Sequence, residues 1–267
     1  MYQGEKIGVG IVTFNRKDGL LKLFNSLPRQ YIDELVIIND GQHYPEYSDL
    51  DCSYILNEEN LGVGCSKNRA LSYLQEKGVD HYFLIEDDVF VKRDDVFLRY
   101  IEMARLTGIQ HFNFSQHGLL NVNPQGQPLV RMRCDYASEK LFMFPSCVGA
   151  FSYYTALALD TVGLMDERFY NALEHVDHTI EIIDAGMHPP FGYFADIADS
   201  QDYIGDEGWS TKQSTISGEL TFRAIVTVAL QRFKQKRGLM PSDITIENTK
   251  KVTWKLEKIH KKYVVSH

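Results

Sequence analysis

The feature that most constrains the fold is a regular alternation of short apolar runs and helical patterns in the first third of the chain. Each apolar run has the length of a buried strand and is bounded by polar residues or glycine. The runs cover residues 7–13, 34–39, 53–56 and 81–85. Helical patterns over 17–27 and 65–75 lie between them. Repeated strand–helix units predict an α/β fold with a mostly parallel central sheet flanked by helices.

Polar side chains gather where three of these runs end, at residues 13–16, 39–41 and 86–88. In parallel sheets the carboxyl ends of the strands lie at one edge, and ligands bind beyond that edge. The coincidence of polar segments and strand ends therefore predicts a binding site for a nucleotide-like ligand.

The acidic triplet Glu86, Asp87 and Asp88 follows an apolar strand directly. Three adjacent carboxylates repel one another, and a bound cation relieves that repulsion. Oxygen ligands without cysteine favour a hard ion, so we expect Mg²⁺ or Mn²⁺ together with substrate phosphates. An exposed acidic turn is the alternative interpretation.

A second cluster, residues 174–178, begins a predicted helix and contains Glu174, His175, Asp177 and His178. Residues three and four positions apart share a helix face, so Glu174, His175 and His178 can lie together. A carboxylate beside an imidazole is suited to accept a proton from an alcohol. The alternative is that the acids cap the helix and the histidines are structural.

The segment 60–69 combines two glycines with the start of a helix, where backbone N–H groups can bind an anion. It contains neither the Walker pattern nor a third glycine after Gly62 and Gly64. Dinucleotide binding therefore has little support.

Charge is unevenly distributed along a chain of net charge −8. Residues 1–218 hold 17 basic and 32 acidic residues, whereas residues 219–267 hold 11 basic and 4 acidic residues. We therefore predict a main domain over 1–218 and a basic helical C-terminal segment over 219–267. Such a segment could contact phosphates or an anionic membrane surface, or it could dock on the acidic body.

The remaining composition is that of an ordinary globular protein, with 44% hydrophobic and 24% charged residues. The four cysteines form no CxxC pair, so a zinc site has no support. The N-terminus lacks the apolar core of a signal peptide, and the longest apolar runs are too short to span a membrane. We expect a cytoplasmic location, with peripheral contact at the inner face of the membrane left open.

Five segments in a fixed order carry a family resemblance. They are 13–16 (Thr-Phe-Asn-Arg), 39–41 (Asn-Asp-Gly), the spaced Asn60, Gly62, Asn68 and Arg69, the triplet 86–88, and 162–169 followed by 174–177 and 185–186. Together they resemble the GT-A glycosyltransferases of family 2, which use a nucleotide sugar, over about residues 6–200. The resemblance implies a Rossmann-like sheet of the GT-A type and glycosyl transfer.

The resemblance also implies roles for individual residues. The nucleobase would be held by Thr13, Phe14, Asn15, Arg16 and Asp40, and the rest of the donor by Gly62, Asn68, Glu86 and Asp87. Asp88 would bind the Mn²⁺ or Mg²⁺ ion that neutralises the leaving diphosphate. The base would be Glu174 or His175, and Asp177 and His178 would contact the acceptor or support the residues that do.

The sequence departs from the family pattern at three points. Glu86 replaces the first aspartate of the metal motif. His175 stands where the family has the aspartate that acts as the catalytic base. The late histidine that is often a third metal ligand has no clear counterpart, since the region near Asp199 offers a carboxylate and His178 and His188 are weaker candidates. The identity of the base and the complete set of metal ligands therefore stay open.

The resulting prediction is a metal-dependent, inverting glycosyltransferase that uses a UDP donor. By family frequency the acceptor is a surface polysaccharide, glycan or lipid-linked group. Alternatives are a glycosyltransferase acting on a modified nucleic-acid base, a nucleotidyltransferase, and a non-catalytic module that binds a sugar nucleotide. The acidic body argues against a nucleic-acid acceptor, because it repels a polyanion.

Overall fold

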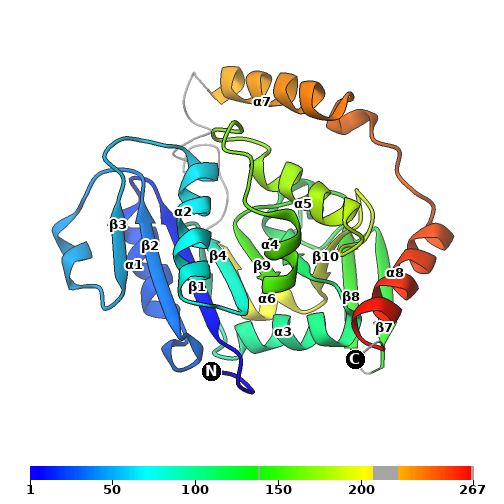
Figure 1. Cartoon of the computed structure of the whole chain (residues 1–267), viewed down its shortest axis with the longest axis horizontal. Coiled ribbons are helices and arrows are strands. Elements are labelled where there is room, and N and C mark those ends of the chain that lie inside the picture. The colour runs from blue at the N-terminus through cyan, green and yellow to red at the C-terminus, as the bar shows by residue number, and fades with distance from the viewer. Residues whose placement is uncertain (138, 207–221, 266–267) are drawn as a thin grey trace.

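The computed structural model describes residues 1–137, 139–206 and 222–265. Its central feature is a six-stranded sheet with the order β3-β2-β1-β4-β9-β6 (Figure 1). The strands are β1 (Ile7–Thr13), β2 (Glu34–Asn39), β3 (Ser53–Leu56), β4 (His81–Glu86), β6 (His111–Asn113) and β9 (Phe151–Thr155). Strands β1 to β4 run parallel, and β9 is antiparallel to both its neighbours. The predicted mostly parallel sheet is confirmed.

Helices cover both faces of this sheet. α1 (Lys17–Ser26) and α3 (Val96–Thr107) pack on one face, and α2 (Val63–Glu76), α4 (Ala156–Val162) and α5 (Glu174–Asp184) pack on the other. β1 is buried on both sides, which explains its continuous apolar run. A Cβ atom at Gly10 would lie 2.7 Å from the Cβ of Ala70, so glycine lets α2 approach β1 closely.

Two smaller sheets complete the body. β7 (Met132–Tyr136), β8 (Glu139–Phe144) and β10 (Phe194–Ile197) form an antiparallel sheet of order β10-β8-β7. β5 (Val89–Val91) pairs with β11 (Ile204–Asp206), and the short helix α6 (Ser200–Tyr203) precedes β11. Because β5 follows the acidic triplet directly, its pairing with β11 brings a late part of the chain next to that triplet.

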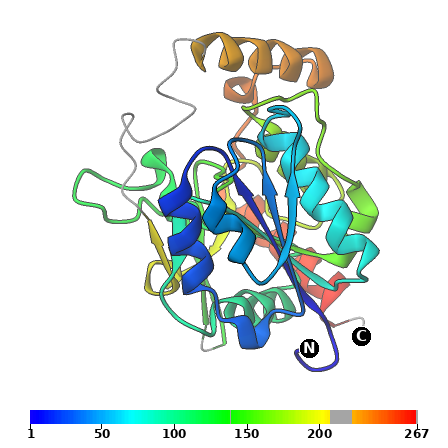
Figure 2. The same ribbon diagram turned by 90° about the vertical axis from the view of Figure 1, so that its left-hand side faces the viewer.

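Two C-terminal helices pack on different sides of the body, as Figures 1 and 2 show. α7 (Phe222–Arg237) lies against α5 and buries Ala229 and Phe233 there. α8 (Thr249–Tyr263) packs against α3, with the 3-10 turn η5 (Pro241–Asp243) between the two helices. The predicted domain boundary at 218/219 lies outside the described residues. No helix in the described parts is long and apolar enough to cross a membrane.

The strand order reverses direction between β1 and β4. From β1 the chain builds outward through β2 and β3, then returns through α2 to place β4 on the other side of β1. Such a reversal leaves a crevice at the carboxyl ends of the two strands. The polar segments that follow β1 and β4 are therefore brought together by topology.

Candidate active site

A cavity of about 470 Å³ lies at the carboxyl ends of β1 and β4. Nine of the predicted site residues line it, namely Thr13, Phe14, Arg16, Asp40, Glu86, Asp87, Asp88, Glu174 and His175. Five others do not, namely Asn15, Gly62, Asn68, Asp177 and His178. The structure thus brings the acidic triplet and the first two residues of α5 into one cavity.

Asp87 connects the ends of β1 and β4. Its carboxylate accepts hydrogen bonds from the hydroxyl of Thr13 at 2.6 Å and from the backbone N–H of Phe14 at 3.3 Å. Burial raises the pKa of Asp87 to about 7, against the opposing effects of the Thr13 hydrogen bond and the Arg16 guanidinium. Asp87, the central acid of the triplet, therefore holds the segments that follow β1 and β4 together at the cavity.

Asp88 has positive charge beside one of its oxygens. Arg16 Nη1 lies 3.8 Å and His117 Nε2 3.4 Å from Asp88 Oδ2. Burial alone would raise the pKa of Asp88, but His117 and Arg16 outweigh burial and hold it below its usual value. The other oxygen, Oδ1, is buried and has no hydrogen-bond partner among the described residues. An unpartnered carboxylate oxygen in a cavity wall suits a hard cation.

His117, which the sequence did not single out, links two carboxylates. It ends the 3-10 turn η3 (Ser115–His117), and its Nδ1 lies 2.7 Å from Asp206 Oδ2. Burial lowers the pKa of His117, but Asp206 and Asp88 outweigh burial and raise it to about 10. His117 therefore lines the cavity beside Asp88, and the last residue of β11 supports it from behind.

The smaller antiparallel sheet holds η3 in position. Asp196 of β10 is fully buried, and its carboxylate accepts from the backbone N–H of Ser115 at 3.0 Å and from the hydroxyl of Ser200 at 2.8 Å. The Ser200 hydroxyl in turn accepts from the side-chain amide of Gln116 at 2.7 Å. These bonds fix the turn that carries His117.

Lys67 is a buried cation that joins two residues of the cavity wall. Its side chain is 1% exposed, and its Nζ lies 2.6 Å from Glu86 Oε1 and 3.2 Å from Glu174 Oε1. Nζ also donates to the carbonyl of Gly149 at 3.3 Å, so its three protons can all be satisfied. Burial lowers the pKa of Lys67, but the two carboxylates outweigh burial and raise it above its usual value.

Glu174 and His175 form a carboxylate–imidazole pair at the start of α5. His175 Nδ1 lies 3.0 Å from Glu174 Oε1, the oxygen that also contacts Lys67. Because an ionised carboxylate only accepts, Nδ1 carries the proton, and Nε2 is left to a ligand in the cavity. Burial would raise the pKa of Glu174, but His175 and Lys67 hold it well below its usual range. Glu174 is thus a poor base and a good orienting group.

Asp40 and its neighbours shape the loops beside the cavity. Asp40 accepts from the backbone N–H groups of Leu61 and Gly62 at 2.8 Å each and from Asn57. Gly62 has a φ of +87°, and a Cβ there would lie 2.5 Å from the carbonyl oxygen of Tyr170, so only glycine fits. The segment predicted to contact the donor is therefore held by Asp40.

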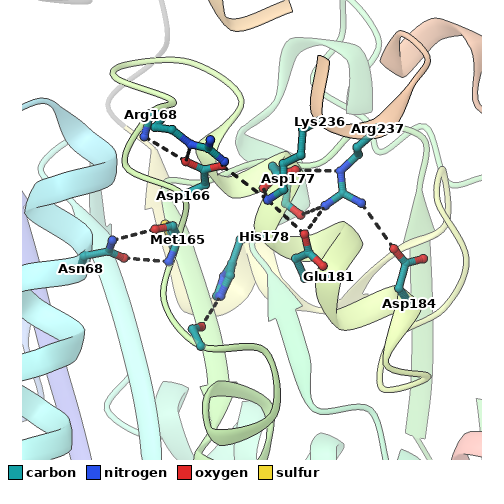
Figure 3. A network of polar contacts seen from close by, with 11 residues as sticks. Asn68, Met165, Asp166, Arg168, Asp177, His178, Glu181, Asp184, Lys236 and Arg237 are labelled. Carbon is teal, nitrogen blue, oxygen red and sulfur yellow. Dashed lines mark hydrogen bonds and ion pairs between the residues drawn. The ribbon is translucent and has the colours of Figure 1, made fainter. Parts of the chain in front are cut away.

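Asn15 and Asn68 also act through loops and not through the cavity wall. The side-chain oxygen of Asn15 accepts from the backbone N–H of Gln42 at 2.8 Å and so joins the ends of β1 and β2. Asn68 donates to the carbonyl of Met165 at 2.8 Å and accepts from its N–H at 2.9 Å (Figure 3). These two bonds between Asn68 and Met165 fix the loop that precedes α5.

Asp177 faces Lys236 and Arg237 of α7 (Figure 3) and does not line the cavity. Its carboxylate is 1% exposed and pairs with Lys236 Nζ at 2.6 Å and Arg237 Nε at 2.7 Å. The same two cations reach Glu181 at 3.1 and 2.8 Å. The basic end of α7 is therefore docked on an acidic face of α5.

The residues considered as a third metal ligand lie elsewhere. His178 contacts the carbonyl of Gly163 at 2.9 Å, and His188 is buried against the carbonyl of Pro189 at 2.8 Å. Asp199 pairs with Arg99 at 3.2 Å. None of these three side chains lines the cavity, whereas His117 does.

Sequence reasoning missed Lys67, His117 and Asp206. Lys67 had a signal, because it lies three and four positions before Ala70 and Leu71, on the apolar face of α2. His117 and Asp206 had none, since only the tertiary fold brings them to Asp88. Within 1–137, 139–206 and 222–265, no three His, Cys, Asp or Glu side chains form a preassembled group that could hold a metal ion.

Comparison with known proteins gives a family match over part of the chain and a fold likeness over nearly all of it. Residues 8–106 match the glycosyl transferase family 2, a span that includes the acidic triplet. The structure resembles S. aureus TarS 1–349, with a TM-score of 0.50 and 13% identity over 98% of this chain and 73% of that chain. It also resembles GalNAc-T7, solved with UDP, GalNAc and Mn²⁺, with a TM-score of 0.53 and 14% identity over 98% of this chain and 55% of that chain.

The curated proteins gave no match. The family match begins at β1 and runs to α3, and thus contains the parallel strands and the polar segments that follow them. The fold likeness extends over nearly the whole chain. The match of residues 8–106 to glycosyl transferase family 2, within a fold of the GT-A type, supports a glycosyltransferase.

Proposed function

We propose that this glycosyltransferase is metal-dependent and inverting, and that it transfers a sugar from a UDP donor to an acceptor hydroxyl. The observation that carries the proposal is the single cavity lined by Asp88, with its unpartnered oxygen, and by the pair Glu174 and His175. GalNAc-T7, which has the same fold, was solved with UDP and Mn²⁺, and this supports the choice of donor and ion.

The donor end of the cavity has groups suited to a nucleoside diphosphate. Asp40 Oδ2 accepts the N–H of Gly62 and retains a lone pair for a base N–H. The Arg16 guanidinium lines the same cavity and suits a phosphate oxygen. Asp88 would hold the metal ion, and His117 would be a second ligand once binding of the ion releases the proton from its Nε2. A divalent ion there would neutralise the charge that develops on the departing diphosphate.

The acceptor end has groups suited to deprotonate an alcohol. We assign the base to His175 Nε2, because Glu174 fixes the Nδ1–H tautomer and is itself too acidic to take the proton. Attack of the acceptor oxygen on the anomeric carbon, opposite the leaving group, inverts that carbon. Val148, Ala172 and Phe222 line the same cavity and suit the apolar face of a sugar or a lipid-linked acceptor.

The first test is calorimetric titration of UDP with and without Mn²⁺. We expect Mn²⁺ to tighten UDP binding at least about tenfold, as expected for an ion bridging protein and phosphates. Asp88→Ala should abolish the Mn²⁺ effect. Asp199→Ala is the matched control, because Asp199 is outside the cavity and should leave the effect unchanged.

The second test separates the base from the donor site. His175→Ala should retain UDP binding and lose about 10²- to 10⁴-fold in turnover, the usual contribution of a general base. The product's anomeric configuration, read by NMR, should be inverted. Release of pyrophosphate in place of a nucleoside diphosphate, or absence of nucleotide binding to the wild type, would overturn the proposal.

A further inference from the structure

The two basic runs of the C-terminal segment have different surroundings. In α7, Lys236 and Arg237 are paired with Asp177 and Glu181 of α5. These two cations are therefore neutralised within the protein and are not available to a partner. The second run, in α8, requires a separate account.

One face of α8 is fixed on the body. Val252, Leu256 and Ile259 are buried at 0–4% exposure and belong to the main core. Asn248 caps the helix by accepting from the backbone N–H of Lys251 at 3.0 Å. The opposite face of α8 is thus presented to solvent in a defined orientation, at a margin of the molecule distant from α7 (Figure 1).

The outward face combines lysines with an exposed tryptophan. α8 contains six lysines and one glutamate. Glu247 forms ion pairs with two of the lysines, Lys251 at 2.8 Å and Lys255 at 2.9 Å. In the described part of the chain, Lys250, Lys258 and Lys262 have no carboxylate within ion-pair distance.

Trp254 lies in the middle of this face. It is 49% exposed, and Lys258 Nζ lies 3.7 Å from the centre of its ring. The helix face therefore combines an exposed amphipathic ring with positive charge, a combination suited to a surface that is both anionic and partly apolar.

We propose that the outward face of α8 binds the surface of an anionic phospholipid bilayer. Tryptophan prefers the interface between headgroups and acyl chains, and lysines beside it are attracted to anionic headgroups. The rest of the chain is acidic, so an anionic membrane repels it. This repulsion favours the orientation of the protein in which α8 faces the membrane. A nucleic acid is disfavoured, because one indole offers little base stacking and the acidic body repels a long polyanion.

The test is co-sedimentation of the full chain with vesicles of equal parts phosphatidylserine and phosphatidylcholine, compared with phosphatidylcholine alone. We expect binding to the anionic vesicles that weakens with added salt. Lys258→Glu/Lys262→Glu should lower the partition coefficient more than about tenfold, and Trp254→Ala should lower it about tenfold.

The matched control is Lys77→Glu/Lys234→Glu, which makes the same change in net charge at exposed positions outside α8. It should lower the partition coefficient less than about threefold. Circular dichroism and Mn²⁺-dependent UDP binding should be unchanged in all variants, which separates this proposal from the proposed function.

Three outcomes overturn the inference. One is equal binding of the wild type to the two kinds of vesicle. Another is an equal loss of binding in the control variant, which would assign the effect to net charge. The third is tighter binding to duplex DNA than to anionic vesicles at the same salt, which would assign the face to nucleic acid.

Discussion

Replacing Lys67 with methionine removes the buried cation that pairs with two residues of the cavity wall, Glu86 and Glu174. Lys67 is fully buried, and its ammonium lies 2.6 Å from Glu86 and 3.2 Å from Glu174. Glu174 is 3% exposed and would be left as a buried charge beside a histidine. Removing one partner of a buried ion pair costs about 3–5 kcal/mol.

Proton uptake by Glu174 sets an upper limit on the free energy of unfolding that the Lys67→Met change can remove. A buried Glu174 without its cation can become neutral, and protonating a glutamate of ordinary pKa near 4.3 at pH 7 costs about 3.7 kcal/mol. The same step costs only about 1 kcal/mol at pH 5. In the wild type the pKa of Glu174 is well below its usual range, so its carboxylate stays ionised at both values.

The variant and the wild type should therefore differ in their pH dependence. In the variant the folded state binds more protons than the unfolded state near pH 6, so its stability rises as the pH falls. Urea unfolding followed by circular dichroism should give a deficit of about 4 kcal/mol at pH 7 that shrinks by about 2–3 kcal/mol at pH 5. The contribution of other titrating groups cancels in the difference.

Lys17→Met is the matched control, because Lys17 forms a single ion pair with Glu46 at 2.9 Å in which both side chains are exposed. It should leave the unfolding curve unchanged at both pH values. A Lys67→Met deficit that is the same at pH 7 and pH 5, or no larger than the change in the control, would refute the reasoning.

Three further predictions concern other parts of the structure. Glu174→Gln should lower kcat by about 10³-fold while UDP binding persists, because an amide no longer stabilises the proton on His175 Nδ1; stopped-flow or product assays measure this. Lys236→Ala/Arg237→Ala should lower the free energy of unfolding by about 3 kcal/mol, because Asp177 is left buried and unpaired; urea titration measures this. Burial lowers the pKa of His188 to about 4, so the unfolded state binds a proton between pH 6.5 and pH 4 that the folded state does not. The free energy of unfolding should therefore fall as the pH drops over this range. The fall should be about 3 kcal/mol larger in the wild type than in His188→Gln.

The sequence predicts the parallel strands well, for a physical reason. A strand buried on both faces must be apolar throughout, and the ends of the run mark where it leaves the sheet. Residues 7–13, 34–39 and 53–56 were predicted with the bounds that the structure has, and β4 differs by one residue. Helix starts are less accurate, because the helix predicted over 65–75 begins at Val63, after Gly62 with a φ of +87°.

The candidate site was predicted where it depends on strand ends, and missed where it depends on pairing between distant segments. Thr13 and Asp87 are expected together because their strands are adjacent. Lys67 and Glu174 are 107 residues apart, and His117 reaches Asp88 only through the turn held by β10. Charge alone could not decide whether the basic tail docks on the acidic body or contacts an anionic surface. Lys236 and Arg237 pair with carboxylates of α5, whereas several lysines of α8 face solvent, and only the fold shows this difference.

Glu86 and His175, the two positions at which we interpreted the sequence as departing from the family pattern, are connected through Lys67. A histidine at position 175 needs a carboxylate on Nδ1 to fix its tautomer, and its neighbour Glu174 supplies one. That carboxylate is buried and needs a cation, which Lys67 provides at 3.2 Å. The longer side chain of Glu86, in place of aspartate, reaches the same ammonium at 2.6 Å and shares its charge. Glu86, Lys67, Glu174 and His175 are therefore parts of one polar unit, and a change at any of them alters the charge balance of the others.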